Sequence, residues 1–106
     1  MRKLIFALFM AVICSGNAWA ECNKNEAKDV INTITSSGVA TREESGITVW
    51  YIWKDNWYGL PKEQRYSFIN GLAGVEDCLK KGVTTRIRVA GKDVARGNRR
   101  GVELLD

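Results

Sequence analysis

The sequence predicts a single small α+β domain in which two helices pack on a mixed sheet of three to four strands, in the order α-β-α-β-β(-β), with one disulfide. Three observations predict this class. Apolar residues recur with the helical period in two segments. Along the C-terminal third the period changes to two, as it does in strands. Two cysteines remain once a secretion signal is removed, which is enough for one disulfide in a domain too small to be very stable on its core alone.

The first twenty residues have the features of a cleavable signal peptide. Two basic residues precede an apolar segment of about eleven residues, which is too short to span a bilayer. Ala18 and Ala20 then supply the small side chains that signal peptidase requires before Glu21. We therefore expect residues 1–20 to be removed and residues 21–106 to form one periplasmic domain, with secretion beyond the periplasm left open.

The number of cysteines left after cleavage is consistent with export. Cleavage removes Cys14 and leaves Cys22 and Cys78 in an oxidising compartment. A disulfide between them would close a loop of about 57 residues and stabilise the domain by about 4 kcal/mol. We predict this disulfide, the alternative being two unpaired buried thiols.

The first helix should span residues 24–37. Asn23 is a favourable N-cap, and Glu26 lies three residues later, as a capping box requires. One apolar stripe follows the helical spacing and consists of Ala27, Val30, Ile31 and Ile34. Gly38 suits the left-handed position that ends many helices. Residues 40–46 are polar and charged, so we expect a loop there.

An interior strand and a long helix should follow. Residues 47–53 carry apolar side chains on both sides of a strand, which is typical of a strand covered on two faces. Pro61 suits the first position of a helix, which should continue to Lys81 and end at Gly82. Its apolar stripe must face the sheet and consists of Phe68, Ile69, Leu72, Val75 and Leu79.

The C-terminal third should form a meander. Residues 84–89 and 94–96 alternate as strands and are expected to be joined by a hairpin turn at Gly91-Lys92. Residues 102–105 should form a last short strand. Because the long helix connects the strand at residues 47–53 to the strand at 84–89, these two strands should be parallel.

Several kinds of chemistry are excluded by residue type. The chain contains no histidine, so neither a triad with a histidine base nor a histidine-ligated zinc site can form. If Cys22 and Cys78 are bonded, no thiol remains in the mature chain as a nucleophile or a metal ligand. No phosphate-binding glycine loop is present. We therefore expect no metal and no cofactor.

Paired carboxylates are the remaining catalytic option. Asp55 and Glu63 flank an aromatic cluster, where a glycosidase-like acid and base could lie. Each also fits an ordinary structural role, since Asp55 suits a turn and Glu63 suits the first turn of a helix. We therefore predict a protein that is not an enzyme.

Aromatic residues form the first candidate binding site. Trp57 and Tyr58 lie just before the long helix and are candidates for contact with a partner. Trp50, Tyr51 and Trp53 lie in the preceding strand. If both helices cover one face of the sheet, part of this cluster is exposed on the other face. If the first helix lies on the far side, the cluster is mostly core.

Basic residues form the second candidate site. From residue 79 onward the chain carries eight basic and three acidic residues, a net charge of +5, whereas residues 21–78 carry six basic and nine acidic residues, a net charge of −3. The candidate binding residues of this part are Arg86, Arg88, Arg96, Arg99 and Arg100. They suit an acidic protein or an anionic surface such as lipid head groups, and an exported protein would not meet nucleic acid. The alternative is that they protect an open sheet edge from pairing.

Together these features predict a small exported binding or accessory protein that acts on an envelope protein. A different class of function is also compatible with them, namely a small toxic polypeptide that acts on the cell envelope through basic and aromatic surfaces. A carboxylate-based glycan hydrolase is the third hypothesis.

Overall fold

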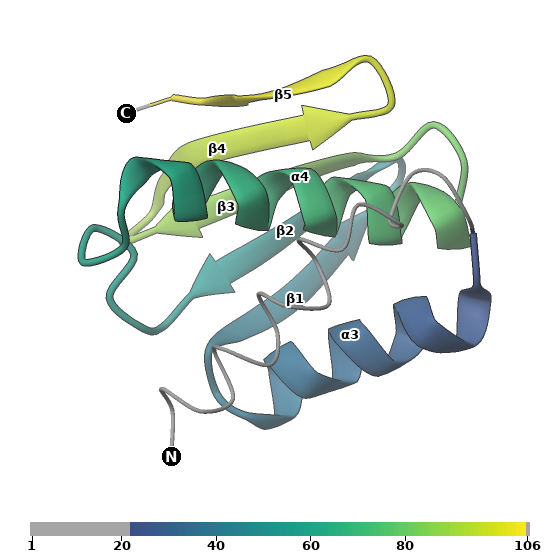
Figure 1. Ribbon diagram of the computed structural model, residues 1–106, viewed down its shortest axis with the longest axis horizontal. Helices are drawn as coiled ribbons and strands as arrows, with labels where there is room; N and C mark the ends of the chain where they lie inside the picture. Colours follow the sequence, from purple (N-terminus) through teal and green to yellow (C-terminus); the bar gives the residue numbers. More distant parts are fainter. Residues whose placement is uncertain (1–21, 106) are drawn as a thin grey trace.

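The computed structural model describes residues 22–105, so the predicted signal peptide lies outside the described residues. The elements follow the order α3 (Lys24–Ser36), β1 (Ala40–Ser45), β2 (Thr48–Trp53), α4 (Lys62–Leu79), β3 (Thr84–Val89), β4 (Lys92–Asn98) and β5 (Gly101–Leu104). The five strands form one sheet in the order β1-β2-β3-β4-β5 (Figure 1). Strands β2 and β3 are parallel, as predicted, and the other neighbours are antiparallel. The predicted small α+β domain is confirmed.

The predicted number of strands and the predicted order of elements are wrong because one strand was missed. Residues Ala40–Ser45, expected to be a loop, form β1, so the sheet has five strands and the order is α-β-β-α-β-β-β. A tight turn at Gly46, with a φ of 60°, joins β1 to β2. As an edge strand β1 needs little apolar alternation, and charged side chains such as Glu43 also keep an edge from pairing with other chains.

The helix signals are confirmed except at Pro61, which is the N-cap of α4 and not its first residue. The N-cap side chain of Asn23 accepts a hydrogen bond from the backbone N–H of Glu26 at 3.1 Å. Gly38, just beyond α3, has a φ of 81°, which only glycine adopts without strain. Helix α4 ends at Leu79, two residues before the predicted end, and Lys80 is already extended.

The turn between β3 and β4 lies one residue earlier than predicted. Ala90 and Gly91 both have a positive φ, of 51° and 81°, as in the turns that match the twist of paired antiparallel strands. Lys92 is the first residue of β4. The sequence concealed this turn because alanine rarely adopts a positive φ. Strand β4 also extends to Asn98, through positions expected to be a loop.

Both helices cover the same face of the sheet (Figure 1). Alternate residues of β2 point into the core between the helices and the sheet, and Val49, Tyr51 and Trp53 are buried there. The other principal core residues are Val30, Ile34, Phe68, Ile69, Leu72, Ile87 and Val94. In the described part of the chain, no helix covers the opposite face of the sheet. The first of the two predicted arrangements of the helices is therefore the observed one.

The predicted disulfide between Cys22 and Cys78 is present. It joins the start of α3 to the last turn of α4, with the two Cα atoms 5.3 Å apart. Cys78 packs against the core at the same point. Among residues 22–105, no helix is both long enough and apolar enough to span a membrane.

Candidate functional site

The open face of the sheet is the candidate functional site. Because side chains alternate along a strand, each residue between two core residues points away from the helices. Strand β2 places Trp50 and Ile52 on this open face, and both are half-buried. Strand β3 places Arg86 and Arg88 beside them, in register with Trp50 and Ile52.

An aromatic ring and a guanidinium group stack at the centre of this face. The Cζ atom of Arg88 lies 5.3 Å from the centroid of the Trp50 ring, within the range of a cation–π interaction. The indole Nε1 of Trp50 is buried and has no hydrogen-bond partner among the described residues. The stack forms an apolar platform that carries positive charge.

Three of the five candidate arginines are already paired within the sheet. Asp93 accepts hydrogen bonds from Nη1 of Arg86 at 3.2 Å and from Nε of Arg88 at 2.9 Å. Arg96 forms an ion pair with Glu103 on the neighbouring strand. These ion pairs show which arginines already have an acidic partner within the protein. The sequence alone did not reveal the pairing.

The other two candidate arginines lie in the turn between β4 and β5. Arg99 and Arg100 are exposed, and their guanidinium groups have no ion-pair partner among residues 22–105. The backbone N–H of Arg100 donates to Oδ1 of Asn98 at 2.8 Å, which fixes the shape of the turn. Among the described residues, the candidate arginines without an ion-pair partner therefore lie at this end of the face.

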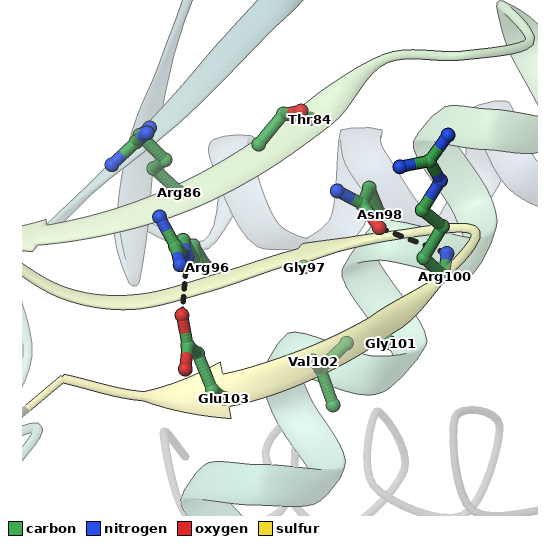
Figure 2. A pocket seen from close by; sticks show the side chains of 9 residues that line it. All are labelled: Thr84, Arg86, Arg96, Gly97, Asn98, Arg100, Gly101, Val102 and Glu103. Atoms are coloured by element: carbon green, nitrogen blue, oxygen red, sulfur yellow. Dashed lines mark hydrogen bonds and ion pairs between the residues drawn. The ribbon is translucent and has the colours of Figure 1, made fainter.

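A hollow of about 450 Å³ lies at the same end of the sheet (Figure 2). It is lined by Thr84, Arg86, Arg96, Gly97, Asn98, Arg100, Gly101, Val102 and Glu103. The structure thus brings together Arg86, Arg96 and Arg100, whereas Arg88 and Arg99 lie outside its lining.

The predicted aromatic pair is separated by the fold. Trp57 is only 1% exposed and packs edge-on against Trp53, with the ring centroids 5.1 Å apart. It is a core residue and cannot reach a partner in this fold. Tyr58 is 56% exposed and remains accessible.

The two candidate carboxylates have structural roles. Oδ1 of Asp55 accepts a hydrogen bond from the backbone N–H of Asn56 at 3.0 Å, as a turn aspartate does. Glu63 is exposed in the first turn of α4, where the helix dipole favours an acid. Within the described part of the chain, no three acidic or cysteine side chains cluster so as to hold a metal ion.

A buried ionic network was not predicted. Glu76 of α4 is 2% exposed, and both its carboxylate oxygens accept hydrogen bonds from Arg42 of β1, each at 2.8 Å. The hydroxyl of Tyr51 also donates to this carboxylate. Burial, with the negative charge of Glu76, raises the pKa of Tyr51 well above its ordinary value, and the hydrogen bond to Glu76 raises the pKa of Arg42.

One signal in the sequence could have revealed this network. Glu76 lies four residues after Leu72 and three before Leu79, so it falls on the stripe of α4 that faces the sheet. An ionised residue in that position needs a buried partner. The network connects α4 to β1 and β2.

A comparison of the chain with models of known families, with curated proteins and with solved structures finds no match.

Proposed function

We propose that the protein is a small exported binding protein whose open sheet face docks on an acidic surface of a cell-envelope protein. The observation that carries this proposal is the platform formed by Trp50 and Arg88, beside Arg86, on a face that no described helix covers. Export is supported by the signal-peptide pattern of residues 1–20, and the disulfide is of the kind that forms in an oxidising compartment.

Tryptophan and arginine suit such a surface for physical reasons. A tryptophan buries a large apolar area with little loss of side-chain freedom, and arginine can hold a carboxylate with two parallel hydrogen bonds. Both residue types are enriched among the residues that dominate binding energy at protein interfaces. The net charge of +5 from residue 79 onward selects an acidic partner.

The internal ion pairs do not prevent such docking. The side chains of Arg86, Arg88 and Asp93 are 30%, 34% and 24% exposed, so water still screens their mutual attraction. Asp93 engages only one nitrogen of each arginine, and a guanidinium group has five N–H donors. Donors therefore remain for a carboxylate of the partner.

Charge reversal on this face tests the proposal. The tagged protein is captured from an envelope extract, and its partner is identified by mass spectrometry and then purified. We expect 1:1 binding that weakens with salt and falls at least ~10-fold in the variant Arg86→Glu with Arg88→Glu. The matched control is Lys24→Glu with Lys28→Glu, which makes the same change of charge at exposed positions of α3, and it should bind normally.

Two results would contradict the proposal. One is unchanged binding by the variant of β3, and the other is an equal loss in the control variant of α3. Leakage of lipid vesicles caused by the wild-type protein, in the absence of any protein partner, would favour the toxic polypeptide instead.

A further inference from the structure

We infer that the hollow at the β4–β5 end of the open face binds a phosphate ester through Arg96, Arg86 and Arg100. This site shares Arg86 with the docking face but does not include Trp50 or Arg88, and the inference does not rest on the proposed protein binding. Three features of the hollow support it, namely its shape, its hydrogen-bonding groups and an unfavourable pair of charges that an anion would relieve.

The shape follows from the register of the strands. Arg86, Arg96 and Glu103 are cross-strand neighbours and form a row of long side chains over β3, β4 and β5. The next row toward the turn consists of short side chains, with Thr84, Asn98 and Gly101. A short row beside a long row leaves a depression, and Figure 2 shows Arg100 rising from the turn beside Asn98.

The groups around this depression are mostly hydrogen-bond donors. Arg86, Arg96 and Arg100 contribute guanidinium groups, and Thr84 contributes a hydroxyl. Oδ1 of Asn98 accepts from the backbone of Arg100, and the amide N–H₂ of Asn98 offers two further donors. Glu103 is the one carboxylate in the lining, and it is paired with Arg96.

The charges of this row are not arranged for stability alone. Arg86 lies directly opposite Arg96 in the β3–β4 pair, and like charges in that position repel. Asp93 pairs with Arg86 and Glu103 pairs with Arg96, and water reaches both ion pairs, so they offset this repulsion only in part. An anion placed between the arginines would relieve the repulsion and would bind more tightly for that reason.

A phosphate ester fits better than a carboxylate. The three free oxygens of a phosphate monoester can accept from arginines that approach from two strands and a turn, whereas a carboxylate has two oxygens in one plane. The volume of about 450 Å³ exceeds what a phosphate group alone requires and lies in the range of small-molecule sites. The remaining space can accept the group to which the phosphate is attached.

The test is a titration of the purified, disulfide-bonded protein with glycerol 3-phosphate, followed by amide NMR at constant ionic strength. We expect saturable shifts at Thr84, Asn98 and Gly101, which acetate does not reproduce. Arg96→Gln should weaken binding ~10-fold, because one charge-assisted contact is lost. Glu103→Gln should strengthen binding several-fold, because it frees Arg96 from its internal partner.

The matched control is Arg99→Gln, in the same turn and with the same loss of charge but outside the lining of the hollow. It should bind within ~2-fold of the wild type. Absence of saturable shifts would overturn the inference, and so would equal weakening by Arg96→Gln and Arg99→Gln. Arg88→Glu separates the two proposals, because it should weaken binding of the protein partner and leave phosphate binding in place.

Vesicles distinguish the source of the phosphate. If the ligand is a lipid head group, vesicles that contain phosphatidic acid, whose phosphate is a monoester, should bind the wild type and not Arg96→Gln, and vesicles of phosphatidylcholine should bind neither. If glycerol 3-phosphate binds and these vesicles do not, the ligand is a soluble phosphate ester. Binding to phosphatidic acid that Arg96→Gln and Arg99→Gln reduce equally would be general charge attraction and would contradict the site.

Discussion

Arg42 and Glu76 are 34 residues apart in the sequence, yet they form a two-point ion pair between the edge strand β1 and the helix α4. Both hydrogen bonds are 2.8 Å long, and the side chain of Glu76 is almost fully buried. The pair connects the least apolar strand of the sheet to the helix that contributes more buried hydrophobic residues than any other element. It therefore fixes the position of β1, which the hydrophobic pattern of that strand does not.

Replacing Arg42 by methionine should destabilise the fold by about 3–5 kcal/mol, because the carboxylate of Glu76 would remain buried without its partner. Denaturant unfolding would measure this free energy. The double variant Arg42→Met with Glu76→Met should be less destabilised than the single variant, since no uncompensated charge is left. The exposed control Arg99→Met should change the free energy of unfolding by no more than about 0.5 kcal/mol. A cost below about 1 kcal/mol for Arg42→Met would show that the pair does not fix β1.

The stability of the fold should fall in alkaline solution through Tyr51. Burial, and next the charge of Glu76, raise the pKa of this hydroxyl well above its ordinary value of 10.0. In the unfolded chain the tyrosine loses its proton near pH 10, whereas in the folded chain it keeps it, so the unfolded state binds fewer protons. This contribution is complete below about pH 10 and is lost as the pH rises toward the folded pKa, by about 1.4 kcal/mol per pH unit.

Tyr51→Phe should remove this contribution, and the free energy of unfolding should then fall less steeply above about pH 10 than in the wild type. The control is Tyr58→Phe, at an exposed position, which should leave the steeper fall in place. Tyrosinate absorbance provides a second readout. On unfolding at pH 11, one more tyrosine should become ionised in the wild type than in Tyr51→Phe. Identical pH profiles for the wild type and Tyr51→Phe would contradict the role of Tyr51.

Trp57 and Tyr58 are adjacent but should respond differently to truncation. Trp57→Ala should cost about 3–5 kcal/mol, because it opens a cavity in the core beside Trp53, which itself packs against Phe68. Tyr58→Ala should change stability by about 0.5 kcal/mol at most. Thermal and denaturant unfolding of the two variants would measure the contrast, and a stable Trp57→Ala protein would place this indole outside the core.

The contrast between these two residues shows what the sequence could predict and what it could not. Local patterns sufficed for α3, for β2 and for the disulfide of Cys22 with Cys78, since each depends on periodicity, capping or compartment. The adjacent aromatics differ only in tertiary packing, which no local pattern encodes. The same limit applies to β1, because an edge strand with one open face needs almost no apolar residues.

In the candidate site too, the sequence predicted the residue types but not the contacts that depend on the fold. The sequence identified the basic residues of β3, β4 and the following turn, and composition was enough for that. It could not separate Arg96, paired with Glu103, from Arg99 and Arg100, because that depends on the register of β4 with β5. Nor could it locate the hollow, which requires the short row of Thr84, Asn98 and Gly101 to lie beside a row of long side chains.

Loss of the disulfide should destabilise the fold strongly. The bond joins residues separated by 56 positions, and in the chain-entropy model a loop of this length contributes about 4 kcal/mol. Cys22→Ser with Cys78→Ser, or addition of a reductant to the wild type, should lower the free energy of unfolding by about that amount. The reductant should not affect the double variant, which serves as the control. A loss below about 1 kcal/mol would mean that the core alone holds α3 in place.

Gly97 is expected to be intolerant of a side chain although it lies in a strand. A Cβ atom at this position would lie 2.9 Å from Cβ of Ala73 in α4 and would contact the side chain of Val102 even more closely. Gly97→Ala should therefore push β4 away from α4 and destabilise the fold by about 1–3 kcal/mol. Adding Val102→Ala should recover part of that loss, because the closer of the two clashes is removed, and a double-mutant cycle in denaturant would measure the coupling. If the effects of the two changes are strictly additive, β4 and β5 have room to move apart. The close packing of Gly97 beneath the hollow would then not be what holds the rows of long and short side chains in register.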